Sequence, residues 1–131
     1  MGIDLSSYKR ETIQTAKAVS HKNPIPQAVK IGNMLFTSAV LGQDPNTRSI
    51  SENPRDQVFQ AFENLKAIIE AGGGTLDNVG KVNVWLKDFD LRDLVNEAWL
   101  KYFPADKPAR MILRTGVMPE ALIELDAVAV L

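Results

Sequence analysis

The sequence predicts an α+β fold in which a mixed β-sheet carries two helices on one face. Two segments have apolar residues at helical spacing, and they alternate with segments that have the composition of strands. The expected order is three strands, a helix, a strand, a helix and two strands. Strand–helix–strand units favour parallel neighbours and short turns favour antiparallel ones, so we expect a mixed sheet. At 131 residues the chain has the length of a single domain, residues 1–131.

Composition excludes several classes of function. The formal net charge is −1 and no basic run occurs, so we expect neither a nucleic-acid partner nor a membrane partner. The chain has no cysteine, which excludes thiol catalysis, and its single histidine, His21, excludes a multi-histidine metal site. The first residues lack the apolar core of a signal peptide, and no apolar run approaches the roughly 18 residues of a membrane span. We therefore expect a cytoplasmic protein.

The first half of the chain is predicted to form an arm, a short strand and a hairpin. Pro24 and Pro26 enforce an extended path before the hairpin, and Gly32-Asn33 has the composition of its turn. The expected bounds are residues 1–11 for the arm, 12–15 for the short strand, 27–31 and 34–41 for the hairpin strands, and 42–51 for a loop.

A long helix is predicted to start after Asn53. Asn53 is a favourable N-cap, Pro54 suits the first helical position, and the glycines of residues 72–74 end the helix. Its apolar residues recur at helical spacing: Val58, Phe62, Leu65, Ile68 and Ile69.

The second half is predicted to contain a helical turn over 75–79 capped by Thr75, a strand over 81–86, and a helix over 91–103. Asp90 is the expected N-cap of that helix, and Pro104 ends it. Within the strand, alternation separates Val82, Val84 and Leu86 from Asn83 and Trp85. Two further strands are expected over 109–115 and 122–131, joined by a turn through Gly116 and Pro119.

The last two strands carry the charges that point most directly to function. We expect these strands to be adjacent, with Arg110 in the first and Glu124 and Asp126 in an otherwise apolar run in the second. A charge within such a run is costly unless it has a partner or a role. Alternation places both acids on the same face as Val128 and Val130, and a subunit interface explains this mixture better than bulk water. We therefore expect a homo-oligomer with the acids at a cleft between chains.

Five segments, in this order, resemble the reactive-intermediate deaminase family (RidA or YjgF type, also called endoribonuclease L-PSP-like). They are Gly32-Asn33-Met34-Leu35-Phe36-Thr37-Ser38, residues 66–73, Lys81-Val82-Asn83-Val84-Trp85-Leu86-Lys87-Asp88, Pro108-Ala109-Arg110 and residues 123–130. The resemblance implies a chorismate-mutase-like fold and a homotrimer in which the sheets form a central barrel. It also implies hydrolysis of reactive enamines and imines to 2-keto acids and ammonia, at clefts between subunits, with no cofactor and no metal.

The resemblance assigns roles to individual residues. Arg110 matches the family's substrate-binding arginine, Glu124 the glutamate that positions the attacking water, and Ser38 a serine that ends a hairpin strand. A planar guanidinium can hold a substrate carboxylate through two hydrogen bonds. Burial would raise the pKa of a glutamate in such a cleft and suit it to proton transfer. The expected catalytic residues are Arg110 and Glu124, and the expected substrate-binding residues are Arg110, Ser38, Ile25, Ile112 and Trp85.

The chain departs from the family pattern at three places. Ile25 stands where the family often has a pocket tyrosine, Ala39 where it has a glycine, and Ile112 where it has a cysteine. A more apolar pocket is expected, and two alternatives to general imine hydrolysis stay open. One is a non-catalytic trimer that binds small carboxylates or regulates a partner, and the other is a deaminase for a pathway-specific enamine such as an aminomuconate-like compound.

Other interpretations of these residues also stay open. The alternative role of Arg110 is structural, as a partner of Glu124 or Asp126 in an ion pair between chains. Asp126 is expected to be an ion-pair partner. The alternative role of Ser38 is to cap the end of a strand with a hydrogen bond. For Trp85, both a position lining the cleft and a position packed in the subunit interface stay open. His21 and Asn23 are expected near the pocket entrance, where a solvated loop histidine is the simpler interpretation of His21.

Overall fold

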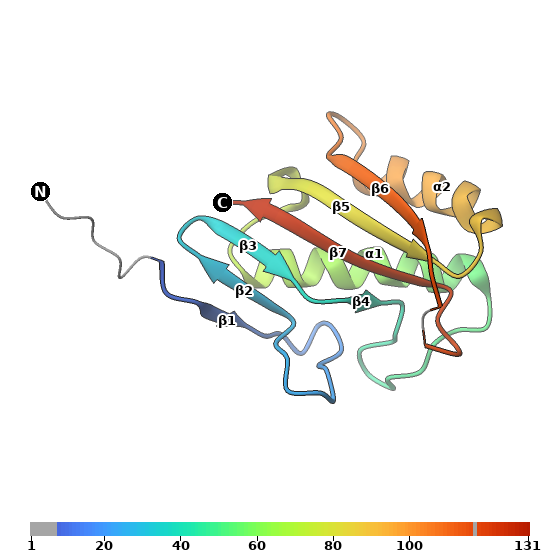
Figure 1. Ribbon diagram of the computed structural model, residues 1–131, viewed down its shortest axis with the longest axis horizontal. Helices are drawn as coiled ribbons and strands as arrows, with labels where there is room; N and C mark the ends of the chain where they lie inside the picture. The colour runs from blue at the N-terminus through green and yellow to red at the C-terminus, as the bar shows by residue number, and fades with distance from the viewer. Residues whose placement is uncertain (1–7, 117) are drawn as a thin grey trace, which may run out of the picture.

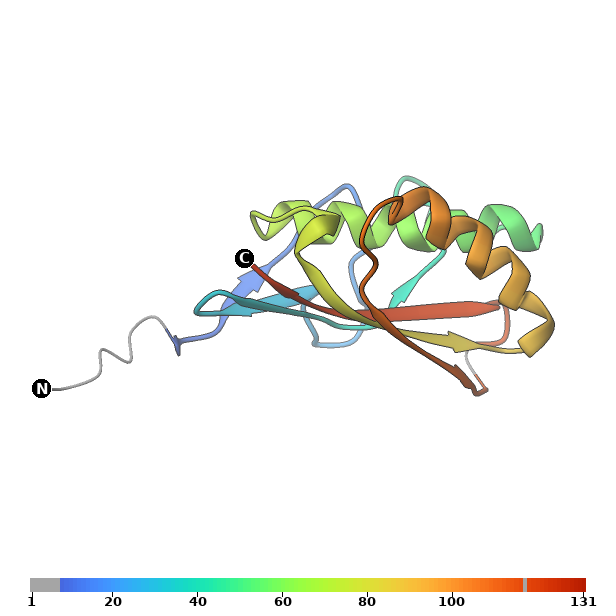
Figure 2. The ribbon, with the colours of Figure 1, turned by 90° about the horizontal axis from the view of Figure 1, so that it is seen from above.

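Both long helices lie on the same face of one mixed sheet, as expected (Figures 1 and 2). The computed structural model describes residues 8–116 and 118–131. Within these residues the sheet has seven strands: β1 (Glu11–Ile13), β2 (Ala28–Ile31), β3 (Met34–Thr37), β4 (Val40–Leu41), β5 (Val79–Leu86), β6 (Ala109–Arg114) and β7 (Ile123–Val130). The long helices are α1 (Pro54–Ala71) and α2 (Arg92–Tyr102), and the short 3-10 turns are η2 (Leu76–Asn78) and η3 (Phe89–Leu91).

The strand order places β7 in the middle of the sheet. Neighbouring strands follow the order β1-β2-β3-β7-β5-β6, and β4 also pairs with β7. The β5–β6 pair is parallel, whereas every other described pair is antiparallel. The expectation that the last two strands are adjacent is therefore wrong, because β5 lies between β6 and β7. Helix α2 connects β5 to β6, because two parallel neighbouring strands need a crossover connection.

Helix α1 starts and ends where the sequence predicts. The side chain of Asn53 accepts a 3.1 Å hydrogen bond from the backbone N–H of Asp56, Pro54 is the first helical residue, and Gly72 follows the last. The predicted apolar stripe is buried, and Phe62 packs against both Trp99 and Tyr102 of α2. This contact between aromatic side chains joins the two helices over the sheet.

Alternation along the two central strands also agrees with the prediction. The residues that face the helices are buried: Val82, Val84, Leu86, Ile123, Leu125, Ala127 and Ala129. Side chains on the opposite face, including Asn83, Trp85, Glu124 and Asp126, are half-buried. The sheet therefore has a second face that a single chain covers only in part.

Three predicted bounds are corrected. The strand expected over 34–41 is interrupted after Thr37, because the Thr37 hydroxyl accepts the Ala127 N–H at 3.0 Å and takes the place of a ladder bond. The short strand expected over 12–15 is β1 and ends earlier, because the Thr15 N–H turns to the side chain of Gln27. Of the arm predicted over 1–11, residues 1–7 lie outside the described residues, and Glu11 already belongs to β1.

The start of α2 also differs from the prediction. Asp90 is not its N-cap. Instead, Asp88 accepts the Asp90 N–H at 2.9 Å and starts the η3 turn, which runs directly into α2.

Neither α1 nor α2 is long and apolar enough to cross a membrane, and the same holds for every helix in the described residues.

Candidate functional site

Arg110 lies near the start of the edge strand β6 and points toward the helices. It is in register with the buried Val82 of β5, and its guanidinium carbon lies 5.0 Å from the centre of the Trp99 ring on α2. Burial lowers the pKa of Arg110, and the charge of Arg92 lowers this pKa further. Among the described residues, no side chain forms an ion pair or hydrogen bond with the guanidinium. A half-buried cation with an aromatic support and free donors is suited to hold an anion.

Ile112 and Arg114 share the face of Arg110. The register pairs Ile112 with Val84 and Arg114 with Leu86, both of which face the helices. Ile112 is half-buried and packs against the core, whereas Arg114 is exposed at the end of the strand. Ile112 therefore provides an apolar surface beside Arg110, on the face that both residues share with Arg114.

Glu124 lies near the start of β7, on the open face of the sheet. It is in register with Trp85 of β5 on one side and with Leu41 of β4 on the other. Burial raises the pKa of Glu124, and the neighbouring Asp126 carboxylate raises it further. The predicted direction of the shift is confirmed, and its main cause is the removal of the carboxylate from water.

Asp126 accepts two side-chain hydrogen bonds and forms no ion pair within the described chain. The Nε1 atom of Trp85 donates to Oδ2 at 2.6 Å, and the Nδ2 atom of Asn83 donates to Oδ1 at 2.9 Å. Two neutral donors on β5 therefore hold the Asp126 carboxylate within one chain, and an ion pair between Asp126 and another subunit stays a prediction. Among the described side chains, the ion pair that forms joins Arg55 and Glu97 on the two long helices.

Arg110 and Glu124 lie on opposite faces of the sheet and are separated by β5. The guanidinium is on the helix side, beside Trp99, whereas the carboxylate is on the open side, in register with Trp85. One chain therefore does not bring the two expected catalytic groups together. A site that uses both groups needs a second copy of the chain.

Ser38 lies between β3 and β4, which both pair with the central strand β7, and Ile25 lies in the loop before β2. The Ser38 N–H donates to the Gln27 carbonyl at 2.9 Å, which fixes the half-buried serine in the gap between β3 and β4. Ile25 precedes β2, and its side chain is 44% exposed. An exposed isoleucine on a loop is available for contact with another molecule.

Two buried glutamines hold the loops around these residues, and the sequence interpretation missed both. Gln57 of α1 donates to the carbonyls of Ser51 and Glu120 and accepts the Leu122 N–H, so it fixes the chain that leads to Glu124. Gln27 bonds in the same manner to Thr15 and Ala18. A signal for Gln57 was present, because the helical period of α1 places this polar residue on the buried face.

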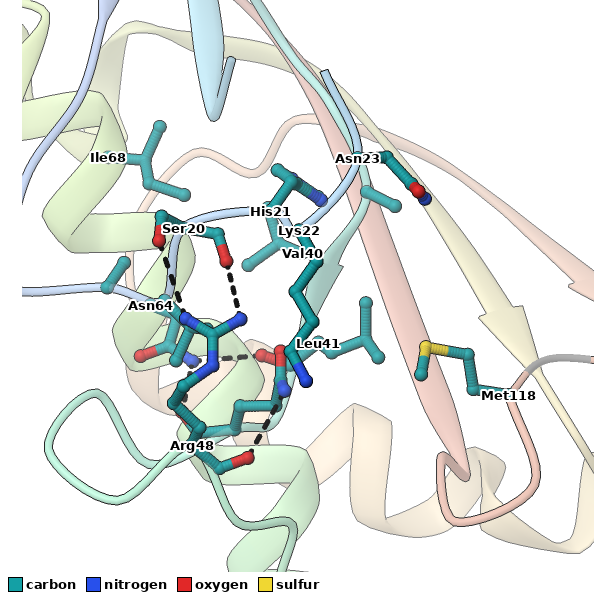
Figure 3. Close-up of a pocket in the computed structure, with 14 residues that line it drawn as sticks. Ser20, His21, Lys22, Asn23, Val40, Leu41, Arg48, Asn64, Ile68 and Met118 are labelled. Carbon is teal, nitrogen blue, oxygen red and sulfur yellow. Dashed lines mark hydrogen bonds between the residues drawn. The ribbon is translucent and has the colours of Figure 1, made fainter. Parts of the chain in front are cut away.

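A pocket of about 340 Å³ lies apart from Arg110 and Glu124 (Figure 3). Its walls come from the segment 18–23, from β4, from Arg48 and from α1, and neither expected catalytic residue lines it. His21 and Asn23, which are expected near the entrance of the catalytic pocket, line this pocket together with Ala39. His21 is only partly buried. Burial is the larger cause that lowers the pKa of His21, and the positive charge of Arg48 is the smaller one.

Comparisons with known proteins agree with the fold. A family model described as endoribonuclease L-PSP matches residues 15–131. Reactive Intermediate Deaminase A, chloroplastic, of Arabidopsis thaliana is 37% identical over 133 residues, covering 100% of this chain and 71% of that protein. The human 2-iminobutanoate/2-iminopropanoate deaminase is 34% identical over 128 residues, covering 96% and 93%. The crystal structure of Escherichia coli TdcF with bound serine superposes with a TM-score of 0.88 at 30% identity, covering 92% of this chain and 98% of that one.

Proposed function

The chain belongs to the endoribonuclease L-PSP family, which includes the reactive-intermediate deaminases, and from this premise we propose that it hydrolyses reactive imines and enamines to 2-keto acids and ammonia. The relatives that are named for deaminase activity align along nearly the whole chain. The observation that carries the proposal is Arg110, a half-buried cation with no bonded partner among the described residues.

Arg110 is the proposed anchor for the substrate carboxylate. The indole of Trp99 limits the positions that the guanidinium of Arg110 can take. The N–H donors of Arg110 are therefore oriented before the substrate arrives. Two parallel hydrogen bonds to the carboxylate would fix the neighbouring C=N bond. TdcF holds serine, an amino acid with a carboxylate of the same kind, and this supports a carboxylate ligand.

Glu124 is the proposed residue that positions the attacking water and transfers protons. The water oxygen adds to the imine carbon while the carboxylate of Glu124 accepts a proton from that water. Glu124 first passes this proton to the imine nitrogen, which gives a carbinolamine. Glu124 then accepts the proton of the carbinolamine hydroxyl and delivers it to the amino nitrogen, so that the C–N bond breaks, ammonia leaves and the carbonyl forms. An acid whose pKa is raised by burial exchanges this proton more readily near neutral pH than an ordinary glutamate does.

A homotrimer would supply the second copy that the site needs. The open face of the sheet exposes Met34, Phe36 and Val130, whose side chains are 37%, 36% and 48% exposed. An apolar surface on the same face as the half-buried Glu124 and Asp126 favours a subunit interface. In this arrangement Arg110 of one subunit and Glu124 of the next would lie across the same cleft, with Ser38, Ile25, Ile112 and Trp85 around the substrate.

An assay of imine hydrolysis tests the proposal. An L-amino acid oxidase generates 2-iminobutanoate in the cuvette, and the rate of 2-oxobutanoate formation is measured with and without the protein. Arg110→Ala should abolish the acceleration, whereas Arg114→Ala, which removes an exposed arginine from the same face of β6, should retain it. Full activity of Arg110→Ala would reject the anchor.

A non-catalytic carboxylate-binding trimer is the second candidate, and the observation that favours it is the exposed Ile25 in place of a pocket tyrosine. Turnover separates the two candidates. If 2-oxobutanoate raises the Tm of the wild-type protein, and the protein accelerates the hydrolysis of no imine that is tested, the chain binds carboxylates without catalysis.

A pathway-specific deaminase is a narrower form of the first candidate. Arg92 lies near enough to Arg110 to lower its pKa, so a second positive charge is available beside the anchor. A substrate with two carboxylates, such as an aminomuconate-like enamine, would use both. Arg92→Ala should then raise the KM for a dicarboxylic enamine and leave the KM for 2-iminobutanoate unchanged, and equal effects on both would reject this form.

A further inference from the structure

The pocket of about 340 Å³ beside α1 has a positively charged lining. Lys22 and Arg48 supply two positive charges, His21 adds an imidazole whose pKa is lowered by burial and by Arg48, and no acidic residue lines the pocket within the described chain. The remaining lining consists of neutral polar and apolar side chains. Because no carboxylate is present to neutralise them, these basic groups favour a negatively charged occupant.

Arg48 is held in place by bonds from both its backbone and its side chain. Its φ angle is 66°, a left-handed conformation that residues with a Cβ atom rarely adopt. The Arg48 N–H donates to the Asp44 carbonyl at 2.8 Å, and its own carbonyl accepts from the Gln43 side chain at 3.2 Å. A glycine would adopt this backbone without strain, so the feature that only arginine supplies is the guanidinium.

The guanidinium of Arg48 bridges two loops and retains donors for a ligand. It donates to the Ser20 carbonyl at 2.9 Å and to the Ser20 hydroxyl at 3.4 Å, as the dashed lines in Figure 3 show. A guanidinium has about five N–H donors, so these two bonds leave others available. The fixed geometry means that little side-chain freedom is lost when an anion binds.

The opposite part of the lining is apolar. Ala18, Val40, Ile68 and Met118 contribute to it, and the first three are buried. Asn64 keeps this wall in place, because its side chain donates to the carbonyls of Leu41 and Gln43 at 2.9 and 2.8 Å. An occupant therefore needs an apolar body as well as an anionic group, and the volume is at the small end of ligand pockets, roughly 300–1,000 Å³.

We propose that this pocket is a binding site for a small organic monocarboxylate with a branched apolar body, separate from the site of Arg110. The carboxylate lies against Arg48 and Lys22, and the apolar body lies against Val40 and Ile68. His21 borders the bound molecule and supplies one further polar contact. The pocket is formed by a single chain, so the proposal does not depend on imine hydrolysis or on the trimer.

The single histidine of the chain makes a direct test possible, because His21 gives the only histidine Cε1–H signal in an NMR spectrum of the ¹³C-labelled protein. The probe is isovalerate, with 3-methylbutanol as its uncharged counterpart. Isovalerate should shift the His21 signal saturably, and 3-methylbutanol should bind at least about tenfold more weakly because it lacks the charge. No saturable shift with isovalerate, or equal binding of the alcohol, would overturn the proposal.

Variants locate the bound isovalerate. Arg48→Gly removes the guanidinium and relieves the left-handed backbone, so the variant should fold and bind isovalerate about tenfold more weakly. Lys22→Gln should also weaken binding, whereas Lys17→Gln, an exposed lysine outside this pocket, should not. Arg110→Ala should bind isovalerate as the wild type does. Loss of the His21 shift in Arg110→Ala would assign the ligand to the proposed catalytic site and overturn the separate one.

Discussion

The Nε1 atom of Trp85 donates a 2.6 Å hydrogen bond to Oδ2 of Asp126. With the second bond from Asn83, this contact fixes the position of the Asp126 side chain on the open face of the sheet. Its negative charge then acts on Glu124, two residues earlier on the same face, where burial is the larger cause of the raised pKa and Asp126 the smaller. The two hydrogen bonds from β5 thus hold Asp126 at a fixed place beside Glu124.

Asp126→Asn should shift the pH profile of imine hydrolysis. The substitution removes one of the two causes that raise the pKa of Glu124, so this pKa falls, although burial keeps it above its ordinary value. Since the ionised form of Glu124 accepts the proton from water, the acid limb of kcat/KM should move to lower pH. Asp93→Asn, on the exposed surface of α2, is the control and should leave the limb in place. A limb that stays fixed or moves to higher pH in Asp126→Asn would contradict the coupling.

Glu124→Gln should lower kcat by about 100-fold or more, because general acid–base catalysis contributes on that order. KM should change little, since the substrate carboxylate is held by Arg110. Steady-state kinetics at several imine concentrations separate the two parameters. A large rise in KM with an unchanged kcat would instead make Glu124 a binding residue.

Trp99→Phe should weaken the orientation of Arg110. The stacking of a guanidinium on an indole is worth about 0.5–1 kcal/mol at a partly exposed site, and phenylalanine gives less of it. KM for 2-iminobutanoate should therefore rise by roughly two- to fivefold. Phe103→Leu is a suitable control, because Phe103 also packs against Trp99, at 4.6 Å between ring centres, and is buried. If both variants raise KM equally, the effect comes from general destabilisation of α2.

Much of the fold could be predicted from local patterns. The capping residues of α1, its apolar stripe and the alternation in β5 and β7 are properties of short segments, and each is confirmed. The order of the strands depends on contacts between distant segments, which alternation does not determine. For this reason the position of β5 between β6 and β7, and with it the separation of Arg110 from Glu124, could not be obtained from spacing.

The surroundings of the site were harder to predict than its residues. Gln57 and Gln27 are ordinary polar residues in the sequence, and only the folded chain brings unpaired backbone groups to them. The pocket next to Arg48 likewise forms where the segment 18–23 meets β4 and α1. Such contacts depend on tertiary packing, so composition and periodicity carry little information about them.

Gln57→Leu should reduce stability more than any surface change on α1. The substitution would leave the Leu122 N–H and the carbonyls of Ser51 and Glu120 without their present partner. The expected loss in the free energy of unfolding is about 2–4 kcal/mol, because unpaired buried polar groups cost about 1–3 kcal/mol each and part of the cost is relieved by water. Chemical denaturation at fixed protein concentration measures it, and Gln60→Leu, which loses only the bond to Asn64, should cost less.

Subunit complementation tests most directly whether the site combines Arg110 of one chain with Glu124 of another. Arg110→Ala and Glu124→Gln are each expected to be inactive, and the two proteins are mixed in equal amounts, unfolded and refolded together. If each site takes its arginine from one subunit and its glutamate from the next, about a quarter of the sites contain both native residues, so the mixture should regain about a quarter of wild-type imine hydrolysis. A mixture as inactive as its two components would contradict a site shared between chains.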